Sequence, residues 1–130
     1  MMKRHFSKAT WESKVGYCRA VRSGDVIAVS GTGAVDESGA VAAPGDAFGQ
    51  ARVCLQILEK ALKQLGGKRS DVIRTRMFVT DISKWSEFAK AHREFFSGED
   101  VPATSMVEVR KLIDPQMLIE IEADAIVRRR

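Results

Sequence analysis

Glu120 is the carboxylate in this sequence whose setting is best suited to chemistry. It lies in the run LIEIEADAIV at residues 118–127. The alternation of this run predicts a strand whose apolar side chains face a core while Glu120, Glu122 and Asp124 share the other face. A carboxylate among apolar neighbours must pair with a positive charge or hold its proton to higher pH, and either state would suit it to position a water molecule. A structural ion pair with an arginine of a neighbouring strand explains Glu120 equally well.

Two further side chains are candidates for chemistry, and both have an ordinary structural interpretation. Cys18 could be a nucleophile if the charge of Arg19 stabilised its thiolate, but a free cysteine is more often a small buried hydrophobe. His92 lies in a stripe of aromatic residues at helical spacing, which favours a core or interface histidine over a general base.

Metal and cofactor motifs are missing from the sequence. Two cysteines and two histidines occur without CxxC or HxxxH spacing, so we expect no metal site and no disulfide framework. Gly31-Thr32-Gly33 lacks the third glycine and the following helix of a dinucleotide-binding loop, and no nucleophile elbow or phosphate-binding loop is present. We therefore expect no cofactor.

The elements that must position these residues follow from periodicity and turn residues. A short edge strand is expected near residues 5–7, and a hairpin over residues 17–21 and 26–31. Residues 36–45 predict a turn, a short extended piece and a second turn. The remaining elements are a helix from Asp46 to Gly66-Gly67, a strand over 72–79, a helix from Asp81 or Ser83 to Gly98, and strands over 103–109 and 118–127.

Two helices can cover only one face of a sheet of five or six strands, which predicts an α+β layer structure. Along residues 72–79, alternation places Ile73, Thr75, Met77 and Val79 under the helices. The uncovered face combines apolar and charged side chains, which indicates an oligomer interface, although a solvated monomer face is the simpler alternative. By parity that face carries Arg19, Arg74, Arg76, Phe78, Met106, Glu108 and Glu120.

Composition sets limits on location and partners. The 130 residues, 45% of them hydrophobic, form one domain over 1–130. No apolar run reaches the length of a membrane span and the first residues lack the apolar core of a signal peptide, so we expect a cytoplasmic protein. Three of the positive charges behind the net +4 are Arg128, Arg129 and Arg130, and no basic stripe with interleaved aromatic residues is present, so we expect no nucleic acid partner.

Several motifs together resemble one family. They are GYCRAV at 16–21 (GPYSQAV in the family), VSG at 29–31, Gln50, Leu58, FVTD at 78–81, FF at 95–96, PATS at 102–105 and IEIEA at 119–123. They resemble the YjgF/RidA family of imine deaminases, also labelled endoribonuclease L-PSP. The resemblance implies a chorismate-mutase-like, single-domain fold with a mixed sheet and two helices on one face. It also implies a homotrimer in which three sheets face inward as a barrel, with small-molecule clefts between subunits.

The resemblance also implies a mechanism and a set of site residues. Family members with the full site hydrolyse 2-imino acids to 2-oxo acids and ammonia, with an arginine on the substrate carboxylate and a glutamate that holds the attacking water. Here Glu120 and Tyr17 are kept, but Thr104 stands at the arginine position, and a hydroxyl cannot make the bidentate charged contact of a guanidinium. The candidate catalytic residues are Glu120 and Cys18, and the candidate substrate-binding residues are Tyr17, Arg19, Ser30, Gly31, His92, Thr104 and Ser105.

Three functions are consistent with these residues. The first is a divergent family member whose clefts bind, and hydrolyse or deaminate, a polar or anionic small molecule, with Arg19 supplying the lost positive charge. The second is a conventional 2-imino acid deaminase that releases ammonia. The third is a non-enzymatic ligand-binding or chaperone-like protein, or the ribonuclease of the family label.

Overall fold

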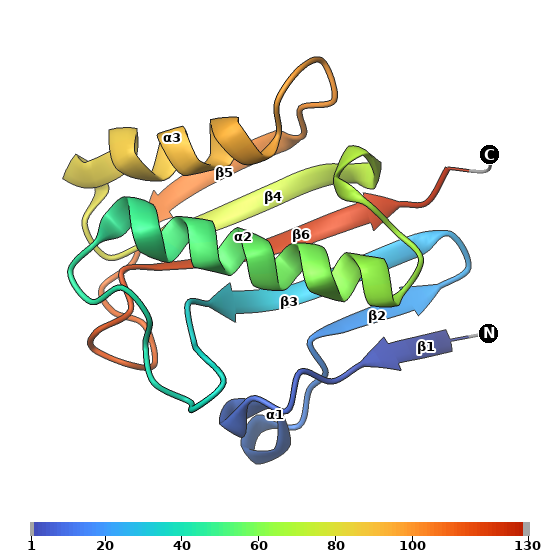
Figure 1. Cartoon of the computed structure of the whole chain (residues 1–130), viewed down its shortest axis with the longest axis horizontal. Coiled ribbons are helices and arrows are strands. Elements are labelled where there is room, and N and C mark those ends of the chain that lie inside the picture. Colours follow the sequence, from blue (N-terminus) through green and yellow to red (C-terminus); the bar gives the residue numbers. More distant parts are fainter. Residues whose placement is uncertain (1, 129–130) are drawn as a thin grey trace.

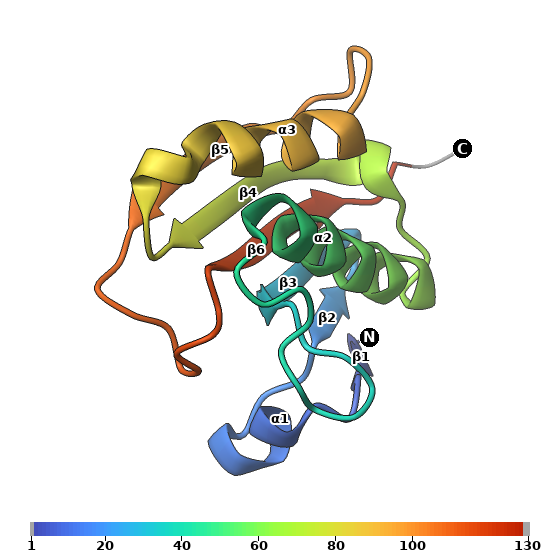
Figure 2. The ribbon, with the colours of Figure 1, turned by 60° about the vertical axis from the view of Figure 1, so that its left-hand side comes forward.

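Six strands form one sheet in the order β1-β2-β3-β6-β4-β5, and two long helices lie on one of its faces (Figures 1 and 2). The computed structural model describes residues 2–128. Neighbouring strands are antiparallel except β4 and β5, which are parallel, so the sheet is mixed as the resemblance implies. The elements are β1 (Met2–His5), α1 (Thr10–Val15), β2 (Ala20–Ser23), β3 (Val26–Gly33), α2 (Ala47–Gln64), the 3-10 turn η1 (Arg69–Asp71), β4 (Val72–Val79), the 3-10 turn η2 (Ile82–Lys84), α3 (Trp85–Phe95), β5 (Ala103–Glu108) and β6 (Ile119–Ile126).

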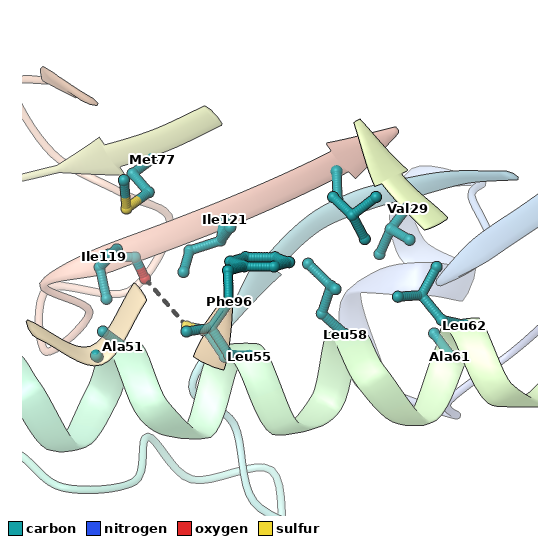
Figure 3. Packing of buried hydrophobic residues seen from close by; sticks show 14 of the residues in the cluster. Val29, Ala51, Leu55, Leu58, Ala61, Leu62, Met77, Phe96, Ile119 and Ile121 are labelled. Atoms are coloured by element: carbon teal, nitrogen blue, oxygen red, sulfur yellow. Dashed lines mark hydrogen bonds between the residues drawn. The ribbon is translucent and has the colours of Figure 1, made fainter. Parts of the chain in front are cut away.

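The core lies between α2, α3 and the covered face of the sheet. Helix α2 begins after Asp46, whose carboxylate accepts from the Gly49 amide at 2.9 Å. Its buried side chains point toward those of β3 and β6 (Figure 3), and Leu58 and Leu62 are fully buried. Burial of one such leucine contributes about 2 kcal/mol, so this stripe is the main attachment of the helix to the sheet.

The alternation predicted for β6 is confirmed, because Ile119, Ile121, Ala123 and Ala125 are all buried. The prediction for β4 is wrong at its start. A register shift between Val72 and Arg74 in the pairing with β6 leaves Val72 buried and Ile73 48% exposed. From Thr75 onward the covered row is as expected.

The predicted facing of β5 is also wrong. Residues in register on neighbouring strands share a face of the sheet, and Met77 pairs with Met106 while Val79 pairs with Glu108. Met106 and Glu108 therefore lie on the helix-covered side, not on the open face. The sequence of β5 is exposed along nearly all its length, so it carries no apolar alternation from which its facing could be read.

The chain before β2 differs from the expectation. Strand β1 spans Met2–His5 and thus overlaps the expected edge strand only at His5, and helix α1 was not predicted. Six residues are too few for helical periodicity to stand out. The buried Glu12 fixes this helix to the preceding segment, because its carboxylate accepts from the Ser7 amide at 3.1 Å and from the Ser7 hydroxyl.

The open face of the sheet has charged pairs and exposed apolar side chains. Arg76 on β4 donates to Glu122 at 3.3 Å and to Asp124 at 3.0 Å on β6, which is the cross-strand pairing that neighbouring acids and arginines require. Val107 and Ile126 on the same face are 45% and 44% exposed. The two long helices, α2 and α3, both lie on the opposite face of the sheet (Figures 1 and 2).

At the C-terminal end, Arg128 is exposed and its Nη2 donates to the Ser70 carbonyl at 2.9 Å. Arg129 and Arg130, the rest of the basic terminus, lie outside the described residues.

None of the helices in residues 2–128 has the length and apolar character that crossing a membrane requires.

Candidate functional site

A cleft of about 740 Å³ opens where the end of β3 meets α1 and the loop that leads to α2. Figure 2 shows that this loop and α1 extend beyond the end of the sheet, away from α3. Helix α1 ends at Gly16, which has a left-handed φ of 93°, and the chain then turns back to enter β2. The predicted site residues on the cleft wall are Tyr17, Arg19, Ser30, Gly31 and Glu120.

A β-bulge shapes the floor of this cleft. Ser30 and Gly31 together oppose Glu122, because Val29 pairs with Ala123 and Thr32 pairs with Ile121. Two hydrogen bonds from Ser30 to the main chain before β2 hold the bulge in place. The Ser30 hydroxyl donates to the Cys18 carbonyl at 2.7 Å, and the Ser30 amide donates to the Arg19 carbonyl at 2.9 Å. Ser30 therefore orients the chain and does not itself need to contact a ligand.

Gly31 lets the Glu120 carboxyl group lie directly against the backbone of the bulge. A Cβ built on Gly31 would lie 2.8 Å from Glu120 Cδ and closer still to Oε1, so any larger residue would displace the carboxylate. This dependence of Glu120 on Gly31 could not be read from the sequence, because it requires the register between β3 and β6.

Glu120 has no ion-pair or hydrogen-bond partner for its carboxylate among residues 2–128. The neighbouring-strand arginine, Arg76, pairs with Glu122 and Asp124 instead. Burial raises the pKa of the Glu120 carboxyl above its usual value, the positive charge of Arg19 opposes this rise, and Glu122 adds to it. Glu120 is thus a half-buried carboxyl group open to the cleft.

Arg19 forms another wall of the cleft. The residue is only 5% exposed, yet its Nε and Nη2 atoms are buried without a hydrogen-bond partner in the described chain. The guanidinium lies over the ring of Tyr17, with 5.3 Å between its carbon and the ring centroid. The main chain of Arg19 is fixed on both sides, by the His5 carbonyl and the Ser30 amide.

Cys18 does not line the cleft, although the residues on either side of it do. Its side chain is half-buried, and its carbonyl serves as the acceptor for Ser30. The structure therefore gives Cys18 a backbone role beside the cleft.

His92, Thr104 and Thr75 form a separate group on the helix-covered face. The Thr104 hydroxyl donates to the Thr75 carbonyl at 3.2 Å, the Thr75 hydroxyl donates to Thr104 Oγ1 at 2.7 Å, and His92 Nε2 lies 2.8 Å from Thr75 Oγ1. Since the Thr75 proton is already donated, His92 Nε2 must be the donor to Thr75. Burial lowers the pKa of His92 and so favours this neutral ring.

These two groups do not meet within one chain. Glu120 lies on the open face and His92 contacts Thr75 on the covered face, while Ser105 lies on the open face of edge strand β5, in register with Arg76. The part of the cleft formed by α1 and by the loop after β3, including Trp11 and Asp36, was not predicted from the sequence. A glycine at residue 16, after Lys14, was the available signal for the end of α1.

No group of three or more His, Cys, Asp or Glu side chains in residues 2–128 is arranged to hold a metal ion.

Comparisons with known proteins agree on one family. The family model described as endoribonuclease L-PSP matches residues 7–127. An uncharacterised protein of Streptomyces coelicolor is 30% identical over 119 residues, which are 92% of this chain and 87% of the relative. The crystal structure of a Mycobacterium tuberculosis member of the YjgF/YER057c/UK114 family is 44% identical with a TM-score of 0.87, covering 98% of this chain and 100% of that one. The YjgF gene product of Escherichia coli is 33% identical with a TM-score of 0.78, covering 86% and 88%.

Proposed function

Because the chain belongs to the endoribonuclease L-PSP (YjgF) family, we propose that it binds a small polar or anionic molecule in the cleft beside β3 and hydrolyses it. In this proposal Glu120 holds the water molecule that attacks the substrate. The observation that carries this proposal is the Glu120 carboxyl group, which lies against Gly31, faces a cleft of about 740 Å³ and has no partner in the described chain. A carboxylate in this state can accept a proton from water as the water attacks carbon.

The reaction class is hydrolytic deamination of an imine or enamine. An enamine first takes up a proton at carbon to become the imine. Water then adds to the C=N carbon while Glu120 takes one proton from the water. The nitrogen is protonated and leaves as ammonia as the remaining O–H proton is released. The carbon becomes a carbonyl and no oxidant or reductant is consumed. This chemistry needs one base, an enclosed cleft and a means of orienting the substrate.

Thr104 argues against an ordinary 2-imino acid as substrate. Its hydroxyl proton is donated to the Thr75 carbonyl, so it has none left for a substrate carboxylate. A neutral hydroxyl also lacks the charge and the two parallel donors that a guanidinium offers. We therefore propose a substrate other than 2-iminobutanoate.

We further propose that the working form is a homotrimer with the open faces of the three sheets turned inward. The cross-strand pairs of Arg76 and the exposed Val107 and Ile126 support an interface there, since apolar and paired charged side chains together suit contact with another protein surface.

The test is ammonia release from freshly generated imines and enamines of varied size, measured against buffer alone. We expect release above the buffer rate from at least one compound other than 2-iminobutanoate, and a loss of about 100-fold in Glu120→Gln, as expected when a general base is removed. A Thr104→Arg variant should gain activity on 2-iminobutanoate. If the protein accelerates release from none of the compounds, hydrolysis is excluded and a non-enzymatic binding protein is favoured. RNA that stays intact with the purified protein excludes a ribonuclease.

A further inference from the structure

We propose that the ligand carries an aromatic group, which binds against Trp11 in the outer part of the cleft. The outer part is the region lined by residues 7–15 and 35–39. The inference rests on the proposed function, because it treats this region as continuous with the cleft that Glu120 lines. It assigns the substrate to the imines and enamines that bear a phenyl group or a larger aromatic ring.

The cleft is larger than the proposed reaction requires. Its volume of about 740 Å³ lies within the range of about 300–1,000 Å³ that is typical of sites for drug-sized ligands. Hydrolysis beside Glu120 involves only the few atoms around a C=N bond. A ligand that fills the cleft therefore extends from Glu120 into the outer part.

Apolar side chains in the outer part and next to it remain exposed. Trp11 and Val15 lie on α1, and Ile113 comes from the segment before β6. Val15 is 66% exposed and Ile113 is 56% exposed. An apolar group of the ligand that covers such a wall is removed from water together with it. The indole ring of Trp11 favours an aromatic group over a saturated one, because stacked or edge-to-face contacts add to the effect of burial.

Helix α1 is fixed, so Trp11 has a defined position. The buried carboxylate of Glu12 accepts from the Ser7 amide at 3.1 Å, and the Glu12 carbonyl accepts from the Tyr17 amide at 2.9 Å. The ammonium group of Lys14 lies 5.3 Å from the centroid of the Trp11 ring and covers one of its faces. A ligand would thus contact the opposite face or the edge of the indole.

The second wall of the outer part, residues 35–39, is also formed in advance. One carboxylate oxygen of Asp36 accepts from the Ser38 amide at 2.9 Å and from the Ser38 hydroxyl at 2.6 Å, which holds the turn closed. A Cβ built on Gly39 would lie 3.9 Å from Thr10 Oγ1, so this turn lies next to the start of α1. Walls that are already ordered lose little conformational entropy when a ligand binds.

The inference is tested by NMR titration of the full ¹⁵N-labelled chain with three uncharged probes. They are 3-phenylpropanamide, 3-cyclohexylpropanamide with a saturated ring of similar size, and propanamide without a ring. We expect 3-phenylpropanamide to shift the indole N–H signal of Trp11 and to bind about 2- to 10-fold more tightly than 3-cyclohexylpropanamide. Propanamide should bind at least about tenfold more weakly than 3-phenylpropanamide, since it buries no ring.

Trp85→Ala is the matched control and also assigns the two indole signals. It removes the same side chain from α3, where Trp85 is 59% exposed and outside the cleft. Trp85→Ala should bind 3-phenylpropanamide as the wild type does, whereas Trp11→Ala should bind it at least about tenfold more weakly. Val15→Asp should also weaken binding, and because Val15 is exposed this variant tests the outer part even if Trp11→Ala folds poorly.

Three results would overturn the inference. They are a Trp11 signal that 3-phenylpropanamide does not shift, equal affinity for the phenyl and cyclohexyl probes, and a Trp11→Ala variant with lower oligomeric mass but unchanged affinity for 3-phenylpropanamide. The last would mean that a neighbouring copy of the chain covers Trp11.

The proposed reaction and this inference fail in different ways. Binding of 3-phenylpropanamide at Trp11 without hydrolysis of any imine refutes the proposed reaction alone. Hydrolysis of small aliphatic imines, with no shift of the Trp11 signal by the aromatic probe, refutes the inference alone.

Discussion

At the scale of single residues, the position of the Glu120 carboxyl group depends on the absence of a side chain at Gly31. Gly31→Ala should displace that carboxylate, since the added Cβ would lie 2.8 Å from Glu120 Cδ. The backbone of Gly31 does not need a positive φ, so the strand itself can accept alanine. We expect hydrolysis to fall about 10- to 100-fold, as misplaced catalytic groups typically cause, with little change in melting temperature.

Ala28→Ser is the control for this substitution. It also adds one heavy atom to β3, but Ala28 is exposed and does not line the cleft. Equal activity of Gly31→Ala and Ala28→Ser would contradict the positioning role of Gly31.

The protonation of Glu120 gives a second prediction at this scale. Burial raises the pKa of the Glu120 carboxyl while Arg19 opposes the rise, so Arg19→Gln should raise this pKa further. Because the folded state holds the proton to higher pH than the unfolded chain, the contribution of Glu120 to stability is present at low pH and is lost as pH rises through the raised pKa. Hydrolysis should follow the opposite course and increase with ionisation of Glu120.

Carboxyl ¹³C NMR of Glu120 across pH measures this directly in the wild type and Arg19→Gln. Glu122→Gln is expected to lower the pKa of Glu120, since it removes a neighbouring negative charge. A Glu120 midpoint at the ordinary value of a solvent-exposed glutamate, unchanged in both variants, would be inconsistent with the described environment.

Several features of the site could be predicted from residue types alone. An acid within an alternating apolar run marks Glu120, and the motifs at 16–21 and 29–31 mark Tyr17, Arg19, Ser30 and Gly31, all of which line the cleft. The partners of a side chain could not be predicted, because they depend on strand register. The bulge that brings Gly31 against Glu120 has no signature in the sequence beyond the glycine itself.

At the scale of elements, α3 is connected to the sheet through the hydroxyl group of Thr75. Thr75→Val keeps the side-chain volume but leaves His92 Nε2–H without its acceptor and removes the hydrogen bond that the Thr75 hydroxyl donates to Thr104 Oγ1. The Thr104 hydroxyl keeps its own acceptor, the Thr75 carbonyl. Thr75 is fully buried, so we expect a loss of about 1–2 kcal/mol in the free energy of unfolding. Urea denaturation at neutral pH measures this loss.

Thr80→Val is the control for Thr75→Val, because Thr80 is half-buried and its hydroxyl makes no hydrogen bond in the described chain. Its unfolding free energy should stay within about 0.5 kcal/mol of the wild type. If the two variants are equally stable, the hydrogen bonds between α3, β4 and β5 contribute no net stability.

The elements differ in how well the sequence predicts them. Helix α2 and strand β6 have regular apolar periods and clear ends, and both were predicted. Helix α1 is only six residues long, and β5 is an exposed edge strand, so neither has a pattern that reports its type or facing. The facing of β5 is set by its pairing with β4, and this long-range contact is not encoded in the local alternation.

At the scale of the whole molecule, the open face of the sheet predicts assembly. Light scattering on the purified protein should give a mass three times the 14.4 kDa of the chain. Val107→Asp and Ile126→Asp should lower that mass, because each places an unpaired charge on an apolar part of the proposed interface. Ile82→Asp is the control, since Ile82 is 40% exposed but lies on η2 beyond the end of β4.

A mass equal to one chain for the wild type would refute the trimer, and loss of the trimer in Ile82→Asp alone would place the interface elsewhere.

The α+β layer with helices on one face followed from the count of elements, and the six-stranded mixed sheet agrees with it. Which residues assemble into one site did not follow. The cleft residues and the His92 group are separated by the sheet, and no local pattern indicates whether they meet across subunits.

The position of β6 in the sheet limits how far this protein can fold during translation. This strand is the last of the sheet to be synthesised, yet it lies between β3 and β4. Until it emerges, β1–β3 and β4–β5 have no hydrogen bonds to each other and the apolar side of α2 has only part of its cover. Folding during translation therefore cannot be completed strand by strand, and a nascent chain stalled before residue 119 should remain a substrate for chaperones and proteases.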